Sequence, residues 1–76
     1  MEAMNVLKAK GKIYYEYFTK DLFYEIICYC QKNARTIESE YSGDYEIISH
    51  YRLDDGRTVD VTYNDDIGVF YSAELV

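Results

Sequence analysis

Hydrophobic residues recur at helical spacing between residues 20 and 34, and they alternate with polar residues on either side of that segment. The helical stripe consists of Leu22, Phe23, Ile26, Ile27, Cys30 and Ala34. Thr19 is a suitable N-cap, and Phe18 and Phe23 occupy the two positions of a hydrophobic staple. The pattern therefore predicts a helix over residues 20 to 34.

The segments outside this helix are typical of antiparallel strands. Residues 12 to 18, KIYYEYF, are rich in aromatic side chains and predict a strand before the helix. After the helix come three or four short runs within residues 35–75, separated by turns rich in Gly, Asp and Asn. Residues 1 to 10 begin without a clear pattern, so we expect them to be frayed.

The turn at residues 54–56, Asp-Asp-Gly, tests the register of one hairpin. A two-residue loop would pair Tyr51 with Asp60 and would place an acid on the apolar face. A three-residue loop, with Gly56 in the left-handed conformation, pairs Tyr51 with Val59 instead. Since a slip of one residue moves a whole strand to the other face, the apolar pattern favours the three-residue loop.

This register assigns the strand residues to two faces. The apolar face is expected to hold Tyr45, Ile47, Tyr51, Leu53, Val59, Val61, Tyr63, Val69, Tyr71, Ala73 and Leu75. The opposite face is expected to hold Glu46, Ile48, His50, Arg52, Thr58, Asp60, Thr62, Phe70, Ser72 and Glu74. The sequence thus predicts a single α+β domain over residues 1–76. One helix packs on a mainly antiparallel four- to five-stranded sheet, in the order β-α-β-β-β(-β).

The composition narrows the classes of partner. The 76 residues carry a formal charge of −6. This charge weighs against direct binding of nucleic acid and against docking to anionic membranes, because both need Lys and Arg. It permits a basic protein or nucleoprotein complex as partner, and it also serves solubility. No apolar run approaches a membrane span and no signal peptide is visible, so we expect a cytoplasmic location.

The sequence contains no recognisable catalytic, cofactor or metal site. His50 is the one histidine, and we expect it on the solvated face, where a lone histidine is more often structural than catalytic. Cys28 and Cys30 point apart on a helix, so they can share neither a disulfide nor a metal ion. The Asp and Asn residues of the turns have backbone roles there. We therefore expect a protein that is not an enzyme and that needs no cofactor or metal.

The acids within the predicted strands are not explained by turn chemistry, because acids are depleted in strands. Acids on an edge strand can protect against aggregation, but Asp60 is hard to explain in this way if its strand is internal. An acidic surface for a cationic partner is the alternative, with exposed Tyr as anchors. The candidate interface residues are Glu46, Asp60, Glu74, Asp54, Asp55, Tyr14 and Tyr24.

In size, acidity, exposed Tyr and lack of a catalytic set, the chain resembles the small acidic inhibitors of phages and mobile elements. Anti-CRISPR proteins and DNA mimics are members of this class. The resemblance is one of general character over the whole chain, and no motif or site residue is carried over from it. It implies a monomer or homodimer that blocks a basic surface of a host nucleic-acid-binding or defence complex. The alternative is a phage or bacterial assembly protein that self-associates and has no inhibitory role.

Overall fold

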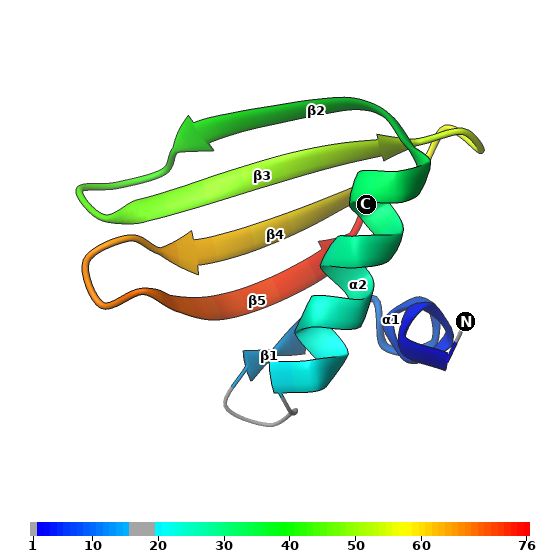
Figure 1. Cartoon of the computed structure of the whole chain (residues 1–76), viewed down its shortest axis with the longest axis horizontal. Helices are drawn as coiled ribbons and strands as arrows, with labels where there is room; N and C mark the ends of the chain where they lie inside the picture. The colour runs from blue at the N-terminus through cyan, green and yellow to red at the C-terminus, as the bar shows by residue number, and fades with distance from the viewer. Residues whose placement is uncertain (1, 16–19) are drawn as a thin grey trace.

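The computed structural model describes residues 2–15 and 20–76 of the chain. Within these residues the elements are α1 (Glu2–Lys10), β1 (Lys12–Tyr14), α2 (Lys20–Asn33), β2 (Ala34–Tyr41), β3 (Glu46–Leu53), β4 (Thr58–Asn64) and β5 (Val69–Leu75). The strands form one antiparallel sheet in the order β1-β5-β4-β3-β2 (Figure 1). The α+β class and the antiparallel sheet are confirmed, and a second helix precedes the elements that the sequence predicted.

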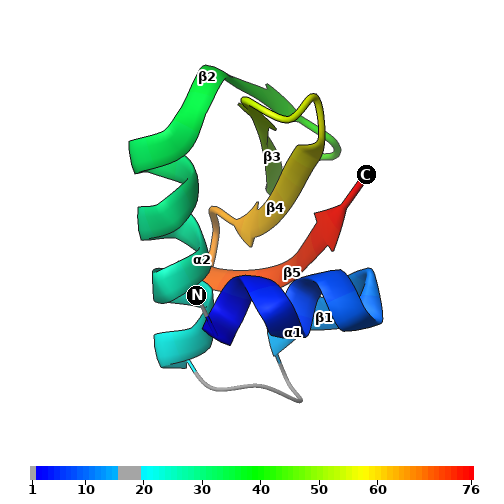
Figure 2. The same cartoon turned by 90° about the vertical axis from the view of Figure 1, so that its right-hand side faces the viewer.

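Both helices pack on the same face of the sheet. Helix α1 contacts α2, β1 and β5, while α2 contacts β2 and β3 (Figure 2). The core lies between the helices and that face of the sheet. Its buried members are Ala3, Met4, Leu7, Ile13, Phe23, Ile26, Cys30, Tyr51, Leu53, Val59, Val61 and Ala73. The opposite face of the sheet carries no helix among the described residues.

The expectation that residues 1 to 10 are frayed is wrong for residues 2 to 10, which form α1. Ala3, Met4 and Leu7 are one turn apart or adjacent, so they make a short stripe that is buried against the core. Gly11 follows the helix with a φ of 78°, a conformation that favours glycine. The carbonyl oxygen of Gly11 accepts a hydrogen bond of 2.7 Å from the Leu75 amide, which ties the end of α1 to β5.

Strand β1 is shorter than the run that predicted it, since it covers Lys12–Tyr14 of the predicted residues 12 to 18. The predicted staple residue Phe18 and the N-cap Thr19 lie outside the described residues. The predicted helix over residues 20 to 34 is confirmed as α2, which ends at Asn33. At that end the Asn33 side-chain amide donates a hydrogen bond of 2.8 Å to the carbonyl oxygen of Tyr29.

The three-residue loop between β3 and β4 is confirmed. Leu53 N–H donates a hydrogen bond of 2.8 Å to the carbonyl oxygen of Arg57, and Tyr51 pairs with Val59. Gly56 has a φ of 86°, the left-handed conformation that the loop requires. The strand residues of β3 and β4 therefore face as the sequence predicted.

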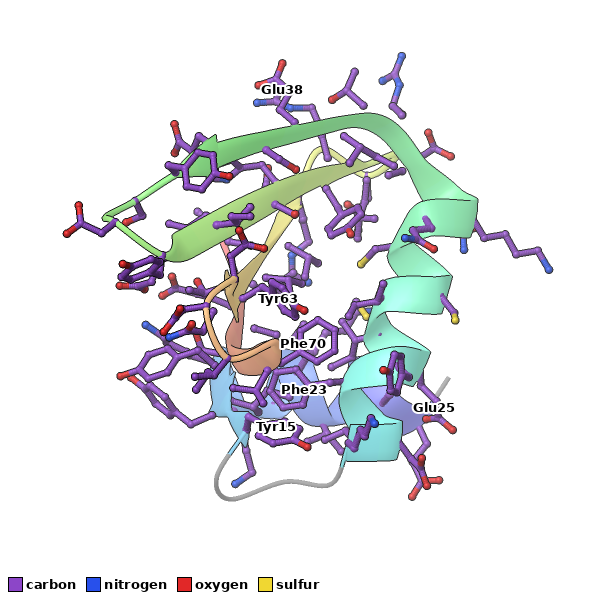
Figure 3. All side chains as sticks on the ribbon, turned by 60° about the vertical axis from the view of Figure 1, so that its left-hand side comes forward. Tyr15, Phe23, Glu25, Glu38, Tyr63 and Phe70 are labelled. Carbon is purple, nitrogen blue, oxygen red and sulfur yellow. The ribbon has the colours of Figure 1, made fainter. Side chains whose placement is uncertain are left out.

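The predicted faces fail at the start of β5, because a β-bulge interrupts its pairing with β4. Thr62 pairs with Ser72 but Tyr63 pairs with Phe70, so Tyr71 is an extra residue on β5. Phe70, expected on the outer face, lies on the helix side, where its ring centroid is 5.2 Å from that of Tyr63. It also stacks on Phe23 at 6.0 Å, within the cluster of rings in Figure 3. Tyr71, expected on the apolar face, lies on the opposite face.

No helix among residues 2–15 and 20–76 is long and apolar enough to cross a membrane.

The burial of α1 predicts that the protein loses stability when a buried side chain of this helix is shortened. Leu7 is fully buried, so Leu7→Ala should lower the free energy of unfolding by about 2 to 5 kcal/mol, as measured by urea denaturation. Lys8→Ala, on the exposed side of the same helix, should change it by less than about 0.5 kcal/mol. Equal effects of the two variants would contradict the docking of α1.

Candidate binding surface

We call the helix-free side of the sheet the open face. It is made of Thr36, Glu38 and Glu40 of β2, Glu46, Ile48, His50 and Arg52 of β3, Thr58, Asp60 and Thr62 of β4, Tyr71, Ser72 and Glu74 of β5, and Lys12 and Tyr14 of β1. Carboxylates outnumber basic groups on this face, as predicted. Its acids come from four neighbouring strands, so they share one surface.

Three of the predicted interface acids line the same hollow of the open face. Glu46, Asp60 and Glu74 line one shallow groove, together with Lys12 and Tyr71 among others. Asp60 and Glu74 are direct neighbours across the β4–β5 pair. Neither Glu46 nor Glu74 has a salt bridge within the described part of the chain. These two carboxylates are therefore available to a cationic ligand.

One histidine of the open face lies between two carboxylates. The Nδ1 atom of His50 is 2.6 Å from Oδ1 of Asp60, and its Nε2 atom is 2.9 Å from Oε1 of Glu40. A carboxylate only accepts hydrogen bonds, so both ring nitrogens can be satisfied at once only when both carry a proton. The hydrogen bonds to Glu40 and Asp60 accordingly raise the pKa of His50 above its ordinary value of 6.5.

The histidine supplies a structural reason for the acid on a central strand. Strand β4 is internal to the sheet, and the Asp60 side chain is only 23% exposed. Its charge is offset by His50 directly opposite on β3. Asp60 therefore has two roles. It holds His50 in position, and its carboxylate is one of the acids that line the groove.

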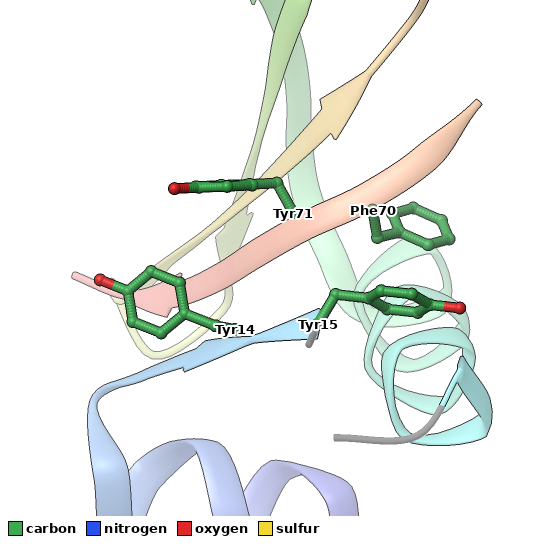
Figure 4. Close-up of a pocket in the computed structure, with 4 residues that line it drawn as sticks. All are labelled: Tyr14, Tyr15, Phe70 and Tyr71. Carbon is green, nitrogen blue, oxygen red and sulfur yellow. The ribbon is translucent and has the colours of Figure 1, made fainter. Parts of the chain in front are cut away.

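Two tyrosines form the aromatic part of the open face. Tyr14 and Tyr71 pack edge to face with their ring centroids 6.1 Å apart, and they are 38% and 57% exposed. The ammonium group of Lys12 lies 5.2 Å from the centroid of the Tyr14 ring, within the range of a cation–π interaction. Tyr14 and Tyr71 also line a small pocket with Tyr15 and Phe70, where β1 meets β5 (Figure 4). The predicted anchor Tyr14 thus lies beside the acidic groove.

The other predicted interface residues lie elsewhere. Asp54 and Asp55 belong to the β3–β4 turn, where Asp55 Oδ1 accepts a hydrogen bond of 2.9 Å from the Arg57 amide. Asp54 Oδ1 is 3.7 Å from Nε of Arg35, and both side chains are well exposed. Tyr24 lies on α2, with its ring edge-on to Phe70 at 5.7 Å. The structure therefore does not bring these three residues together with the open-face acids.

Glu38, Glu40, His50 and Tyr71 belong to the open face and were not among the predicted interface residues. The three-residue loop already placed His50 opposite Asp60, so this pair was readable from the sequence. Glu40 requires the register of β2 against β3, in which it pairs with Ile48 and lies diagonally from His50. No sequence signal marked the bulge that moves Tyr71 to this face.

The described part of the chain has no cluster of side chains for a metal ion, and one of its two thiols is buried. No group of three or more His, Cys, Asp or Glu side chains in residues 2–15 and 20–76 could hold a metal ion. Burial raises the pKa of the Cys30 thiol to about 11, which keeps it protonated at neutral pH. Cys28 is exposed on the surface of α2. The open face presents carboxylates beside two exposed tyrosine rings, a combination that is chemically complementary to a cationic, partly apolar surface.

Comparisons with protein-family models, with curated proteins and with solved structures give no match for this chain.

We call the contacts of His50 with Asp60 and Glu40 the His50 bridge. This bridge predicts that the stability of the fold decreases as the pH rises. Because the pKa is raised in the folded state, the bridge stabilises fully below pH 6.5, and this contribution is lost as the pH rises through the folded-state pKa. His50→Gln should remove this part of the pH dependence in urea denaturation curves. The imidazole resonances of the one histidine in the chain report its pKa by NMR. We expect a value above 6.5 that falls in Asp60→Asn, and a value at or below 6.5 would refute the bridge.

Proposed function

We propose that this chain is a non-enzymatic binding protein that inhibits a host nucleic-acid-binding or defence complex. Its open face occupies a basic surface of that complex, as in inhibitors of the anti-CRISPR and DNA-mimic type. The observation that carries the proposal is the groove formed by Glu46, Asp60 and Glu74 beside the exposed pair Tyr14 and Tyr71.

The chemistry of the open face suits a surface that normally binds nucleic acid. Such surfaces present Lys and Arg to phosphates and often aromatic or Arg side chains to bases. Carboxylates on Glu46 and Glu74 can take the place of phosphates, while Tyr14 and Tyr71 offer flat apolar rings beside them. The formal charge of −6 adds long-range attraction to a basic partner, which speeds the encounter.

The alternative function, self-association without inhibition, has one specific feature in its favour. Strand β2 is an edge strand whose residues are exposed along nearly its whole length. Two copies joined at such an edge would form a continuous sheet. Association of this kind would depend on protein concentration, whereas binding of the open face to a basic partner would depend on salt.

The proposal predicts salt-sensitive capture of a nucleic-acid-binding protein. The immobilised protein should retain such a protein from nuclease-treated bacterial lysate at low salt and release it at high salt. The purified partner should then bind duplex DNA less well when this chain is added. Glu46→Lys combined with Glu74→Lys should reduce retention by about tenfold, a loss of about 1.4 kcal/mol, because both open-face charges are reversed.

The matched control reverses two acids away from the open face. Glu25 lies on α2, on the opposite side of the molecule from Glu38, and Asp54 lies in the β3–β4 turn (Figure 3). Glu25→Lys combined with Asp54→Lys changes the net charge by the same amount and should leave retention within about twofold. Equal losses of retention in the two double variants would show that binding depends on net charge alone and not on the open face. Retention of nothing except the chain itself would favour self-association.

A further inference from the structure

Strand β2 leaves one edge of the sheet open along eight residues. It is the last strand in the sheet order, it pairs with β3 alone, and no described element lies beyond it (Figure 1). All of its residues are exposed except Ala34, which is half-buried. The strand at the other edge, β1, has only three residues. The β2 edge is therefore the one long enough to accept a further strand among the described elements.

The hydrogen-bond pattern shows which backbone groups of β2 point outward. Ser42 N–H donates a hydrogen bond of 2.8 Å to the carbonyl oxygen of Glu46, so these two residues form a hydrogen-bonded pair. In antiparallel strands such pairs alternate with pairs that are not hydrogen-bonded. Thr36, Glu38 and Glu40 of β2 therefore direct their backbone groups to β3. Ile37, Ser39 and Tyr41 direct their N–H and C=O groups away from the sheet.

The side chains of β2 differ sharply between its two faces. Glu38 and Glu40 lie on the open face, where they pair with His50 and Ile48 of β3. On the helix side, Ile37 is 51% exposed and Tyr41 is 68% exposed. Helix α2 crosses the sheet near the start of β2 and leaves the far end of the strand uncovered (Figure 1). An added strand would meet carboxylates on one face and apolar side chains on the other.

We propose that the β2 edge binds an extended basic segment of a partner protein as a sixth, antiparallel strand. The segment carries Lys or Arg at alternate positions facing Glu38 and Glu40, and apolar residues between them facing Ile37 and Tyr41. Backbone hydrogen bonds to Ile37, Ser39 and Tyr41 supply the pairing, as in β-strand addition at exposed sheet edges. This site is distinct from the groove of the open face and does not depend on the function proposed above.

The charges on β2 disfavour a second copy of the same chain in two of the possible two-fold pairings. In a two-fold pairing centred on Ser39, Glu38 of each copy would lie opposite Glu40 of the other. Like charges directly opposite each other destabilise an antiparallel pair. In a pairing centred on Glu38 instead, the Glu38 carboxylates of the two copies would lie opposite each other. Lysine or arginine at the same positions removes the repulsion.

The test uses a synthetic peptide that alternates valine and lysine, with a valine and glutamate peptide as the charge control. Fluorescence anisotropy should show that the protein binds the lysine peptide at least about tenfold more tightly. Ser39→Pro removes an outward N–H while sparing the hydrogen bonds to β3, and it should weaken binding about tenfold. Ser39→Ala keeps that N–H and loses only the 3.1 Å contact with the Ser49 hydroxyl, so binding should stay within about twofold.

Amide resonances of the unmodified protein give a measurement that needs no folded variant. The lysine peptide should shift the amide resonances of Ile37, Ser39 and Tyr41 and slow their hydrogen exchange. Shifts confined to residues of the groove, or equal binding of the two peptides, would overturn the proposal. So would equal binding by Ser39→Pro and Ser39→Ala. A dimer of the protein that Ser39→Pro dissociates would show that the edge takes a second copy, which would also overturn it.

Discussion

The turn between β3 and β4 fixes which side chains reach the core and which remain on the open face. Gly56 takes the left-handed conformation that closes a three-residue loop, and Tyr51 then pairs with Val59 under the helices. A loop shorter by one residue would pair Tyr51 with Asp60 and would bury a carboxylate beneath α2. The same register that builds the core also places His50 opposite Asp60 on the other face. Both faces therefore depend on one short turn.

The bulge on β5 is a local exception to this alternation, and both sides of the sheet use it. One extra residue lets Phe70 turn toward the helices, where it contacts the rings of Phe23, Tyr24 and Tyr63. The same residue, Tyr71, moves to the open face and packs against Tyr14. A regular β5 would have exposed Phe70 to solvent on the acidic face, and the open face would have lost one of its two tyrosines. Bulges often re-aim a side chain in this way.

The parts of the fold that the sequence predicted are those with local signals. Helix α2 has a long apolar stripe, and the β3–β4 hairpin has a turn whose loop length can be tested against the strand pattern. Helix α1 has only three buried residues, and it is stable because they dock on α2 and β5, which a local pattern does not reveal. The bulge on β5 is likewise determined by tertiary contacts, because it places the Phe70 ring against aromatic rings from other elements.

The same limit applies to the candidate site. Glu46, Asp60 and Glu74 were expected on one face because hairpin pairing alone sets their direction. That they share a groove depends on the order of the strands in the sheet, in which β4 lies between β3 and β5. Hairpin pairing within the sequence did not determine this order. The position of Glu40 beside His50 needs the β2–β3 register in addition. Asp54 and Asp55 were grouped with the interface by charge, but Asp55 accepts a hydrogen bond within the turn and Asp54 lies beside Arg35.

The acidic side chains of β2 lie on the open edge strand of the sheet, and one of them also takes part in the His50 bridge. Charged residues on an edge strand oppose pairing with strands of like charge, which protects against aggregation. The same repulsion selects among incoming strands, because a basic strand meets attraction where an acidic one meets repulsion. Glu40 belongs both to this edge and to the bridge, at 2.9 Å from Nε2 of His50. Deprotonation of His50 removes the positive charge beside Glu40, so the edge becomes more negative as the pH rises, and the proposed preference for basic strands becomes stronger.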